Sequence, residues 1–335
     1  MDSITQEEEL LEKQFESEIL KISTIIPENE IIKECVIGEG GFGKVYKGMY
    51  NKQKVAIKKI KLQDKDEEIF ESLLNEIKVI VKADNPEIPK FFGIMKKKGK
   101  YHLIFEFVQG NSLKLLYPKL THDQKIKISY DLCGILQKFH AKNLIHRDIK
   151  PGNVMIEENN LTVKLIDFGV SKIASHTSTY TKAQIGTVPY MSPEQFQIDL
   201  DKFGDPDCED VKSVPISIKS DIWSLGVMIS EIFSGVRPYF NISKKHNPTE
   251  QMITSRLSRN SPFPIPKGIN EDIKLIVQRA TEVNPEQRAT AEEVKEMFSK
   301  LIIKREEQKL QQEMEQKLTI TNASTTTTTA AAATV

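Results

Sequence analysis

The chain contains the segment Leu144-Ile145-His146-Arg147-Asp148-Ile149-Lys150-Pro151-Gly152-Asn153, followed shortly by Leu165-Ile166-Asp167-Phe168-Gly169. These two segments place two acids, an amide and a cation at short spacings. Carboxylate and amide oxygens are ligands that magnesium accepts, and a lysine ammonium can neutralise phosphate charge. The two segments therefore indicate a site that handles a metal-bound phosphate.

In this order and context, the two segments resemble the catalytic loop and the metal-binding turn of the eukaryotic protein kinases. The resemblance covers roughly Ile31 to Ile303. It implies an α+β, bilobal protein kinase fold. A five-stranded antiparallel sheet plus one helix would form an N-lobe over about 31–109, and a mostly α-helical C-lobe would cover about 110–303. ATP and Mg2+ are the implied cofactors, and proteins with Ser/Thr acceptors are the implied substrates.

Length and charge limit the class of protein. The 335 residues can bury a large core, which is enough for two lobes with short extensions. The 47 basic residues balance the 47 acidic ones, so we expect no general attraction to nucleic acid. No segment approaches the roughly 20 apolar residues that a membrane span requires. The three scattered cysteines indicate reduced thiols, and we expect an intracellular, cytoplasmic protein.

Both ends of the chain are expected to extend beyond the two lobes. Residues 1–30 form an N-terminal extension with an amphipathic helix, because four apolar residues have helical spacing: Leu11, Phe15, Ile19 and Ile22. Residues 304–318 should form a charged helix. Residues 319–335 are rich in threonine and alanine and lack apolar area to offset chain entropy, so we expect disorder there. The oligomeric state stays open.

The glycine-rich segment from Ile37 to Val45 contains the pattern Gly-x-Gly-x-x-Gly. Glycine is needed where backbone must bend tightly and approach phosphate oxygens. Glycine-rich hairpins and dinucleotide-binding folds share the pattern, but the latter need a helix directly after the glycines. Here a β-like segment leads to Val55-Ala56-Ile57-Lys58 instead. That context favours the phosphate-covering loop of a kinase.

Lys58 lies on a short apolar strand, where an unpaired ammonium would carry a substantial desolvation cost. By the resemblance, its partners are a helix glutamate and the α- and β-phosphates of ATP. Glu76 fits the helix motif of the family and has apolar neighbours at Leu73 and Ile80. Glu71 is the competing position, and we favour Glu76.

The resemblance assigns further positions to the nucleotide. Four apolar residues are expected to sandwich the adenine: Ile37, Val45, Ala56 and Met155. Backbone groups of Glu106 and Val108 would bind it at the hinge, and Phe105 takes the gatekeeper position. The full predicted nucleotide-binding set is Ile37, Gly38, Glu39, Gly40, Gly41, Phe42, Gly43, Lys44, Val45, Ala56, Lys58, Phe105, Glu106, Val108 and Met155.

The resemblance also implies roles for the polar residues of the opening segments. Asp148 would accept or orient the proton of the attacking hydroxyl, and Lys150 would neutralise charge on the γ-phosphate. Asn153 and Asp167 are the predicted metal ligands, for magnesium. A lysine two residues after the catalytic aspartate is the pattern of serine/threonine kinases. The predicted catalytic residues are Asp148, Lys150, Lys58 and Glu76.

His146 is predicted to have a structural role. A histidine in this position invites an acid–base interpretation, but within this motif it should support the core behind Phe168, together with Ile80, Phe91 and Asp221. The other histidines have no partner at metal-ligand spacing, so we do not expect zinc.

The activation segment implied by the resemblance runs from Asp167 to Glu194. Glu194 should form a buried pair with Arg288, and Ser192 stands where the family usually has alanine. Arg147 would need an anion, and our hypothesis is that one of the residues Thr177 to Thr181 is phosphorylated and orders the loop. An upstream kinase or autophosphorylation would do this. The alternative is a merely solvated loop.

The chain between Glu194 and Asp221 is longer than is usual in the family, and the extra residues fall in the acidic stretch from Asp199 to Val214. We interpret this stretch as a solvated insertion, although it could bind a basic partner. The short connection from Gly48 to Val55 resembles the tyrosine-kinase-like group of serine/threonine kinases.

The leading hypothesis is a protein serine/threonine kinase acting in intracellular signalling. The alternatives are a pseudokinase or scaffold that works through nucleotide-dependent conformation and flanking helices, and a small-molecule kinase. The substrates and the pathway cannot be read from this sequence.

Overall fold

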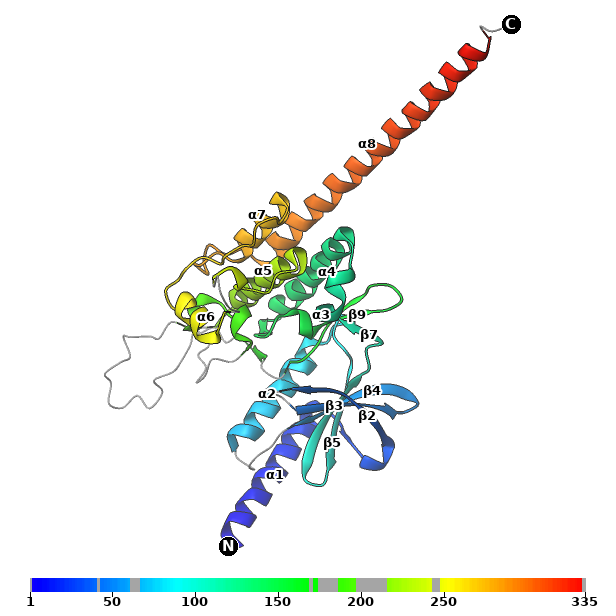
Figure 1. Ribbon diagram of the computed structural model, residues 1–335. Helices are drawn as coiled ribbons and strands as arrows, with labels where there is room; N and C mark the ends of the chain where they lie inside the picture. The colour runs from blue at the N-terminus through cyan, green and yellow to red at the C-terminus, as the bar shows by residue number, and fades with distance from the viewer. Residues whose placement is uncertain are drawn as a thin grey trace.

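A computed structural model of the chain describes residues 2–40, 43–60, 67–168, 171–173, 186–196, 216–242 and 248–332. It has a sheet-rich N-lobe and a helical C-lobe, with α1 (Asp2–Ile22) at one end and α8 (Ala291–Ala332) extending from the other (Figure 1). This is the predicted bilobal α+β arrangement. Four groups of predicted features lie outside the described residues: Gly41 and Phe42, Gly169, the acceptors at 177–181, and the insertion at 199–214.

The N-lobe sheet has six strands in the order β1-β5-β6-β4-β3-β2. Its antiparallel strands are β2 (Ile31–Gly40), β3 (Gly43–Tyr50), β4 (Gln53–Ile60), β5 (Phe91–Lys97) and β6 (Lys100–Glu106). The added strand β1 (Ile25–Ile26) pairs in parallel with β5 and comes from the N-terminal extension. The prediction of a five-stranded sheet was therefore one strand short. Two residues are too few to show the alternation from which a strand is predicted.

Helix α2 (Glu67–Ala83) packs against this sheet, and its Leu73 and Ile77 share one core with Leu103 of β6. Its C-terminal end is held by the C-lobe. Lys142 Nζ donates to the carbonyls of Ala83 and Asp84 at 2.8 and 3.1 Å. A cation is favourable there because the last carbonyls of a helix carry partial negative charge.

The C-lobe is built around α5 (Ile218–Ser234), whose residues from Ser220 to Ile232 are buried. A capping box between Ser217 and Ser220 starts this helix, and Gly235 ends it in the left-handed region with φ of 70°. The other C-lobe elements are β7 (Gly110–Ser112), α3 (Leu113–Leu116), α4 (His122–Ala141), β8 (Leu144–Ile145), β9 (Val154–Glu157), β10 (Val163–Leu165), β11 (Lys172–Ile173), α6 (Glu250–Leu257) and α7 (Glu271–Ala280). Short 3-10 helices lie at 28–30, 117–119, 151–153, 188–190, 193–196 and 240–242.

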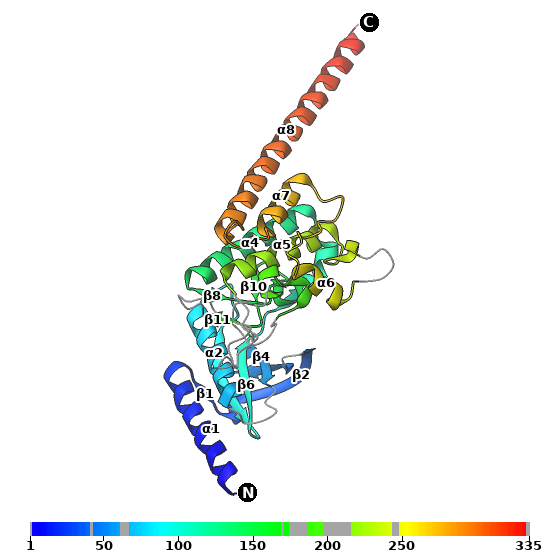
Figure 2. The same ribbon diagram turned by 90° about the vertical axis from the view of Figure 1, so that its left-hand side faces the viewer.

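Helix α8 begins in the C-lobe, where it buries Val294 and Phe298. Arg305 and Lys309 then pair with Asp123 at the start of α4. From there α8 runs away from the lobes (Figures 1 and 2). Its residues 304–318 match the predicted charged helix, but they continue the last C-lobe helix without a break.

The backbone of α8 is helical to Ala332, which differs from the disordered tail that we predicted for residues 319–335. Extending an existing helix avoids the cost of nucleation, and the alanines at 330–332 favour it, whereas the threonine run at 325–329 has low helix propensity. None of the helices in the described ranges has an apolar stretch long enough to cross a bilayer.

Candidate active site

Lys58 of β4 is buried between two carboxylates from distant parts of the chain. Its Nζ donates to Glu76 Oε1 of α2 at 2.8 Å and to Asp167 Oδ1 at 2.9 Å. Burial by itself lowers the pKa of Lys58, but the two carboxylates outweigh this effect and raise the pKa above its ordinary value. The ammonium is therefore charged at neutral pH. The favoured partner Glu76 makes this contact, whereas Glu71 is exposed.

Asp148 is held in one orientation by three neighbouring side chains. Lys150 Nζ and Asn153 Nδ2 donate to its Oδ2 at 2.6 and 2.8 Å. Thr187 Oγ1 donates to its Oδ1 at 2.7 Å and accepts from Lys150 Nζ, also at 2.7 Å. The structure thus brings together the predicted residues Asp148, Lys150 and Asn153 around one carboxylate.

The backbone of this loop is fixed by Asp221 of α5. Its buried carboxylate accepts from the N–H groups of His146 and Arg147, both at 2.8 Å, and lies 3.0 Å from His140 Nε2. Burial by itself raises the pKa of Asp221, but its hydrogen bonds with His140 and with the backbone of His146 outweigh it and lower the pKa below its ordinary value. Arg147 has φ of 71°, a left-handed conformation that is strained for a residue with a Cβ. The bonds to Asp221 hold it there.

His146 packs in the core, as predicted. Its ring stands edge-on to Phe168 with centroids 5.2 Å apart, and its Nε2 lies 3.2 Å from the carbonyl of Ile166. Burial lowers the pKa of His146, so the ring is neutral near pH 7. A neutral, enclosed imidazole supports Phe168 and the turn before Asp167.

We expect this histidine to make the fold sensitive to acid. Its pKa in the folded chain is below the unfolded value of 6.5, so the unfolded chain binds more protons. Stability should therefore fall as the pH drops below about 6.5 and level off above it. Thermal melts across this range check the sign. His146→Phe should be less stable at high pH but show a flatter dependence, and an unchanged slope would contradict the assignment.

The predicted nucleotide-binding residues lie side by side on neighbouring strands. In the sheet register, Gly38 is opposite Val45, Val45 is opposite Lys58, and Ala56 is opposite Phe105. Apart from Lys58 these residues are only partly buried, whereas Val55 beside Ala56 is fully buried. The sheet therefore leaves this surface open for a ligand. Other predicted positions here are Ile37, Glu39 and Lys44, of which Glu39 and Lys44 form an exposed ion pair at 3.3 Å.

Glu106 stands at the start of the connection between the lobes. Its N–H donates to the carbonyl of Lys90 at 2.8 Å, so it can offer a nucleotide its carbonyl but not its N–H. Its carboxylate pairs with Lys164 of β10 at 3.1 Å, which ties the connection to the C-lobe. Val108 follows, buried. This arrangement fits the predicted use of backbone groups at Glu106 and Val108. Met155 lies partly buried on β9, opposite Ser112 of β7.

Phe105 packs its ring against Phe91 with centroids 5.3 Å apart, where it would close the space behind an adenine. We expect Phe105→Ala to raise the affinity of bulky adenine-competitive inhibitors by about tenfold or more, because it opens an apolar cavity that they can fill. Calorimetric titration measures this, with Phe107→Ala as the neighbouring control. No gain in affinity would mean that the assignment of the hinge to Glu106 and Val108 is wrong.

Asn153 and Asp167 fit a magnesium ion. Both bonds from Asn153 Nδ2 go to Asp148, which turns the amide oxygen away from that residue. Ile166 donates its N–H to the carbonyl of Asn153 at 2.9 Å, so Asp167 adjoins the catalytic loop. Carboxylate and amide oxygens are hard ligands that magnesium accepts while it keeps several waters. In the described ranges no three His, Cys, Asp or Glu side chains gather into a metal cage.

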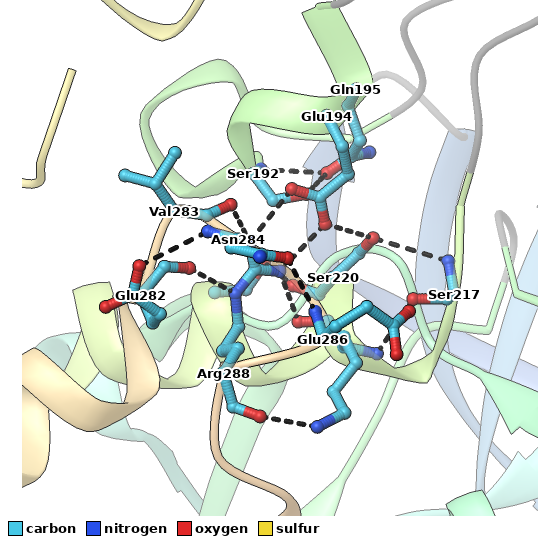
Figure 3. A network of polar contacts seen from close by, with 12 residues as sticks. Ser192, Glu194, Gln195, Ser217, Ser220, Glu282, Val283, Asn284, Glu286 and Arg288 are labelled. Carbon is cyan, nitrogen blue, oxygen red and sulfur yellow. Dashed lines mark hydrogen bonds and ion pairs between the residues drawn. The ribbon is translucent and has the colours of Figure 1, made fainter. Parts of the chain in front are cut away.

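Glu194 and Arg288 form the predicted buried pair (Figure 3). Arg288 Nη1 and Nη2 donate to Glu194 Oε1 and Oε2 at 2.7 and 2.9 Å. The remaining bonds of this guanidinium go to the backbone carbonyls of Lys219, Glu282 and Val283. Ser192 donates to Gln195 Oε1 at 3.0 Å, so the serine in place of alanine is satisfied although it is buried.

Sequence reasoning missed Thr187. Thr187 lies within the predicted activation segment, where no role was predicted for it, yet its hydroxyl joins Asp148 to Lys150. The available signal was Gly186 before it. A Cβ on Gly186 would lie 2.8 Å from the carbonyl of Arg147, so glycine is what lets this segment approach the catalytic loop.

Comparison with known proteins agrees with this geometry. The family of the protein kinase domain matches residues 31–298. The chain belongs to the protein kinase family. The matched residues therefore include the candidate site and both lobes apart from β1, and α1 and most of α8 also lie outside them.

Three relatives show the range of the similarity. A probable serine/threonine-protein kinase of Dictyostelium discoideum is 30% identical over 77% of this chain and 49% of its own length. Mitogen-activated protein kinase kinase 7 of Arabidopsis thaliana is 28% identical over 82% of this chain and 85% of its own length. Human tyrosine-protein kinase Fer is 28% identical over 84% of this chain and 32% of its own length. The chain thus spans about half the length, or less, of several relatives that it matches.

Proposed function

We propose that this chain is an ATP- and magnesium-dependent protein serine/threonine kinase. One observation carries the proposal: Lys58, Glu76 and Asp167 are joined by hydrogen bonds, and Asp148 and Asn153 are joined to one another beside them. A pseudokinase would be expected to have lost one or more of these groups. None of the five is lost, so the enzyme is favoured over a scaffold.

The proposed roles follow from what each group can do at its position. Lys58, held by Glu76, would bind the α- and β-phosphates. Asn153 and Asp167 would hold magnesium. Bound Mg–ATP supplies the phosphoryl group and the cation that offsets its charge. Asp148, whose carboxylate is fixed by three neighbours, would orient a substrate hydroxyl and take its proton.

The choice of serine or threonine as acceptor is proposed from Lys150. Its Nζ lies 2.6 Å from Asp148 Oδ2, so its positive charge stands where a γ-phosphate would pass to a hydroxyl. Thr187 holds it there at 2.7 Å. The lysine two residues after the aspartate is the serine/threonine pattern, which is why the tyrosine specificity in the name of one relative is not carried over.

We also propose that phosphorylation activates this kinase. Arg147 is buried, and within the described part of the chain its Nε has no hydrogen-bond partner. Burial lowers the pKa of Arg147 to about 10, which leaves it charged at neutral pH. A phosphate on one of residues 177–181 would supply the missing anion.

Replacing all five residues 177–181 with alanine should therefore lower activity by about tenfold or more, because a charge-assisted hydrogen bond is worth about 1.5–3 kcal/mol. The measurement is the initial rate of protein phosphorylation. Phosphatase treatment should lower the activity of the wild type by the same factor. It should not change the activity of the variant. Unchanged activity of the variant would refute this mode of activation.

The function itself is tested by incubating the full chain with γ-labelled ATP, magnesium and a generic basic protein, with and without a magnesium chelator. We expect label on serine and threonine, dependent on magnesium. Label on phosphotyrosine alone would overturn the specificity. Nucleotide binding without transfer would identify a pseudokinase, and transfer only to a small molecule would identify the third class. The same test can be run on the proposed domain, residues 31–303, to examine its boundaries.

A further inference from the structure

The helix that precedes the matched kinase domain is fitted to the helix that carries Glu76. α1 buries Phe15 and Ile19, one turn apart on a single face. The Phe15 ring lies 4.7 Å from Phe70 of α2 and 5.1 Å from Tyr101 of β6. Phe70 in turn lies 6.2 Å from Tyr101. The three rings, from three elements, therefore form one cluster. Phe15 of α1 lies closer to each of the other two rings than they lie to one another.

Charge fixes α1 to the sheet beside this aromatic contact. Lys96 of β5 pairs with Glu12 and Glu16 of α1 at 3.0 and 2.8 Å. Tyr101 donates its hydroxyl to Glu12 or Glu16, at 3.1 and 3.2 Å. Lys97 pairs with Glu28 at 2.7 Å. The acidic extension thus meets the basic end of β5.

The sheet is also shaped to receive the extension. Ile94 donates its N–H to the carbonyl of Thr24 at 2.9 Å, and the strand pairing of β1 with β5 follows. A Cβ on Gly93 would lie only 2.4 Å from that same carbonyl oxygen. Glycine at this position permits the close approach, so the edge of the sheet and the extension fit one another.

These contacts bear on Glu76 because they add a support at the N-terminal end of α2 to the packing of this helix against the sheet. Lys142 holds the carbonyls at its C-terminus, and Phe70 lies near its N-terminus, with Glu76 between them. Figures 1 and 2 both show α1 beside α2 at the end of the N-lobe away from α8. A shift of the N-terminal half of α2 would move Glu76 relative to Lys58.

We propose that α1 is a built-in activating element, in which Phe15 is a positioning residue that holds α2 where Glu76 reaches Lys58. The inference rests on the proposed kinase function for its effect on rate. Displacing α1 lets α2 move outward, which lowers the fraction of molecules with the Lys58–Glu76 pair formed. The observed rate falls with that fraction.

The test compares Phe15→Ala with Leu20→Ala in the full chain. Leu20 lies on the same helix but is 62% exposed, so its loss should change little. For Phe15→Ala we expect kcat to fall by about tenfold, the effect of reducing the competent population to about one in ten. The KM for the protein substrate should change by less than about threefold, and Phe15→Leu should restore most of the rate.

Two further readouts separate positioning from general instability. Hydrogen exchange across residues 67–83 should be faster in Phe15→Ala and unchanged in Leu20→Ala, with the C-lobe helices unaffected. In a Glu76→Gln background, Phe15→Ala should cost little more, because both changes act on one interaction. Glu16→Gln, which weakens the polar contact without a cavity, should give a smaller effect of the same kind.

Equal losses of rate from Phe15→Ala in both backgrounds, or unchanged exchange in α2, would overturn the inference. The exchange measurement needs no turnover. It therefore judges the placement of α2 even if the chain transfers no phosphate, in which case the proposed function fails on its own assay.

Discussion

Asp148→Asn is expected to lower kcat by about 10²–10⁴-fold, the usual contribution of a positioned general base. The asparagine keeps the shape of the side chain and a hydrogen-bonding oxygen. It loses the negative charge, and with it the capacity to take a proton from a substrate hydroxyl. Labelled phosphate transfer to a basic protein measures the effect. Equal labelling by the variant would exclude Asp148 from the chemistry.

The control must show that the loss is chemical. Asp131→Asn removes a carboxylate from an exposed pair with Lys127, at 2.6 Å, on the surface of α4. It should retain nearly full activity, since exposed pairs contribute about 0–1 kcal/mol. The affinity of Asp148→Asn for nucleotide without magnesium should stay close to wild type, because Lys58 does not contact Asp148. Its melting temperature reports any loss of the buried contacts with Lys150 and Asn153.

Arg288→Met is expected to destabilise the chain by about 3–5 kcal/mol, because it leaves the carboxylate of Glu194 buried without its partner. Arg288 is enclosed in the C-lobe, and both of its terminal nitrogens bond Glu194. Denaturant titration measures the free energy of unfolding. Activity should fall as well, since Glu194 anchors the end of the predicted activation segment, which also contains Thr187.

An exposed pair again supplies the comparison. Arg279 lies 3.9 Å from Glu293 with about half of each side chain in solvent, so Arg279→Met should change stability by less than about 1 kcal/mol. The double variant Glu194→Leu with Arg288→Met should be more stable than Arg288→Met alone, because no charge is left unpaired. If the double variant has the lower free energy of unfolding, then the unpaired buried charge is not the cause of the destabilisation by Arg288→Met.

The sequence by itself determined the parts of this protein that are local. Helical spacing predicted α1, and the spacing of Asp148, Lys150 and Asn153 is short enough for one loop to bring them together. The partner of Lys58 was also predicted: a buried ammonium needs an anion, and the resemblance to the family's helix motif favoured Glu76 over Glu71.

Apart from the Glu194–Arg288 pair, which the resemblance implied, only the tertiary structure decided which distant elements meet. Lys58 and Asp167 are 109 residues apart, and Thr187 reaches Asp148 because Gly186 lets two segments approach. The extension was predicted as a helix, yet its burial against Phe70 and Tyr101, and the strand that follows it, were not. Periodicity records which face of a segment is apolar. The surface that covers that face is set by packing between segments, which no single segment encodes.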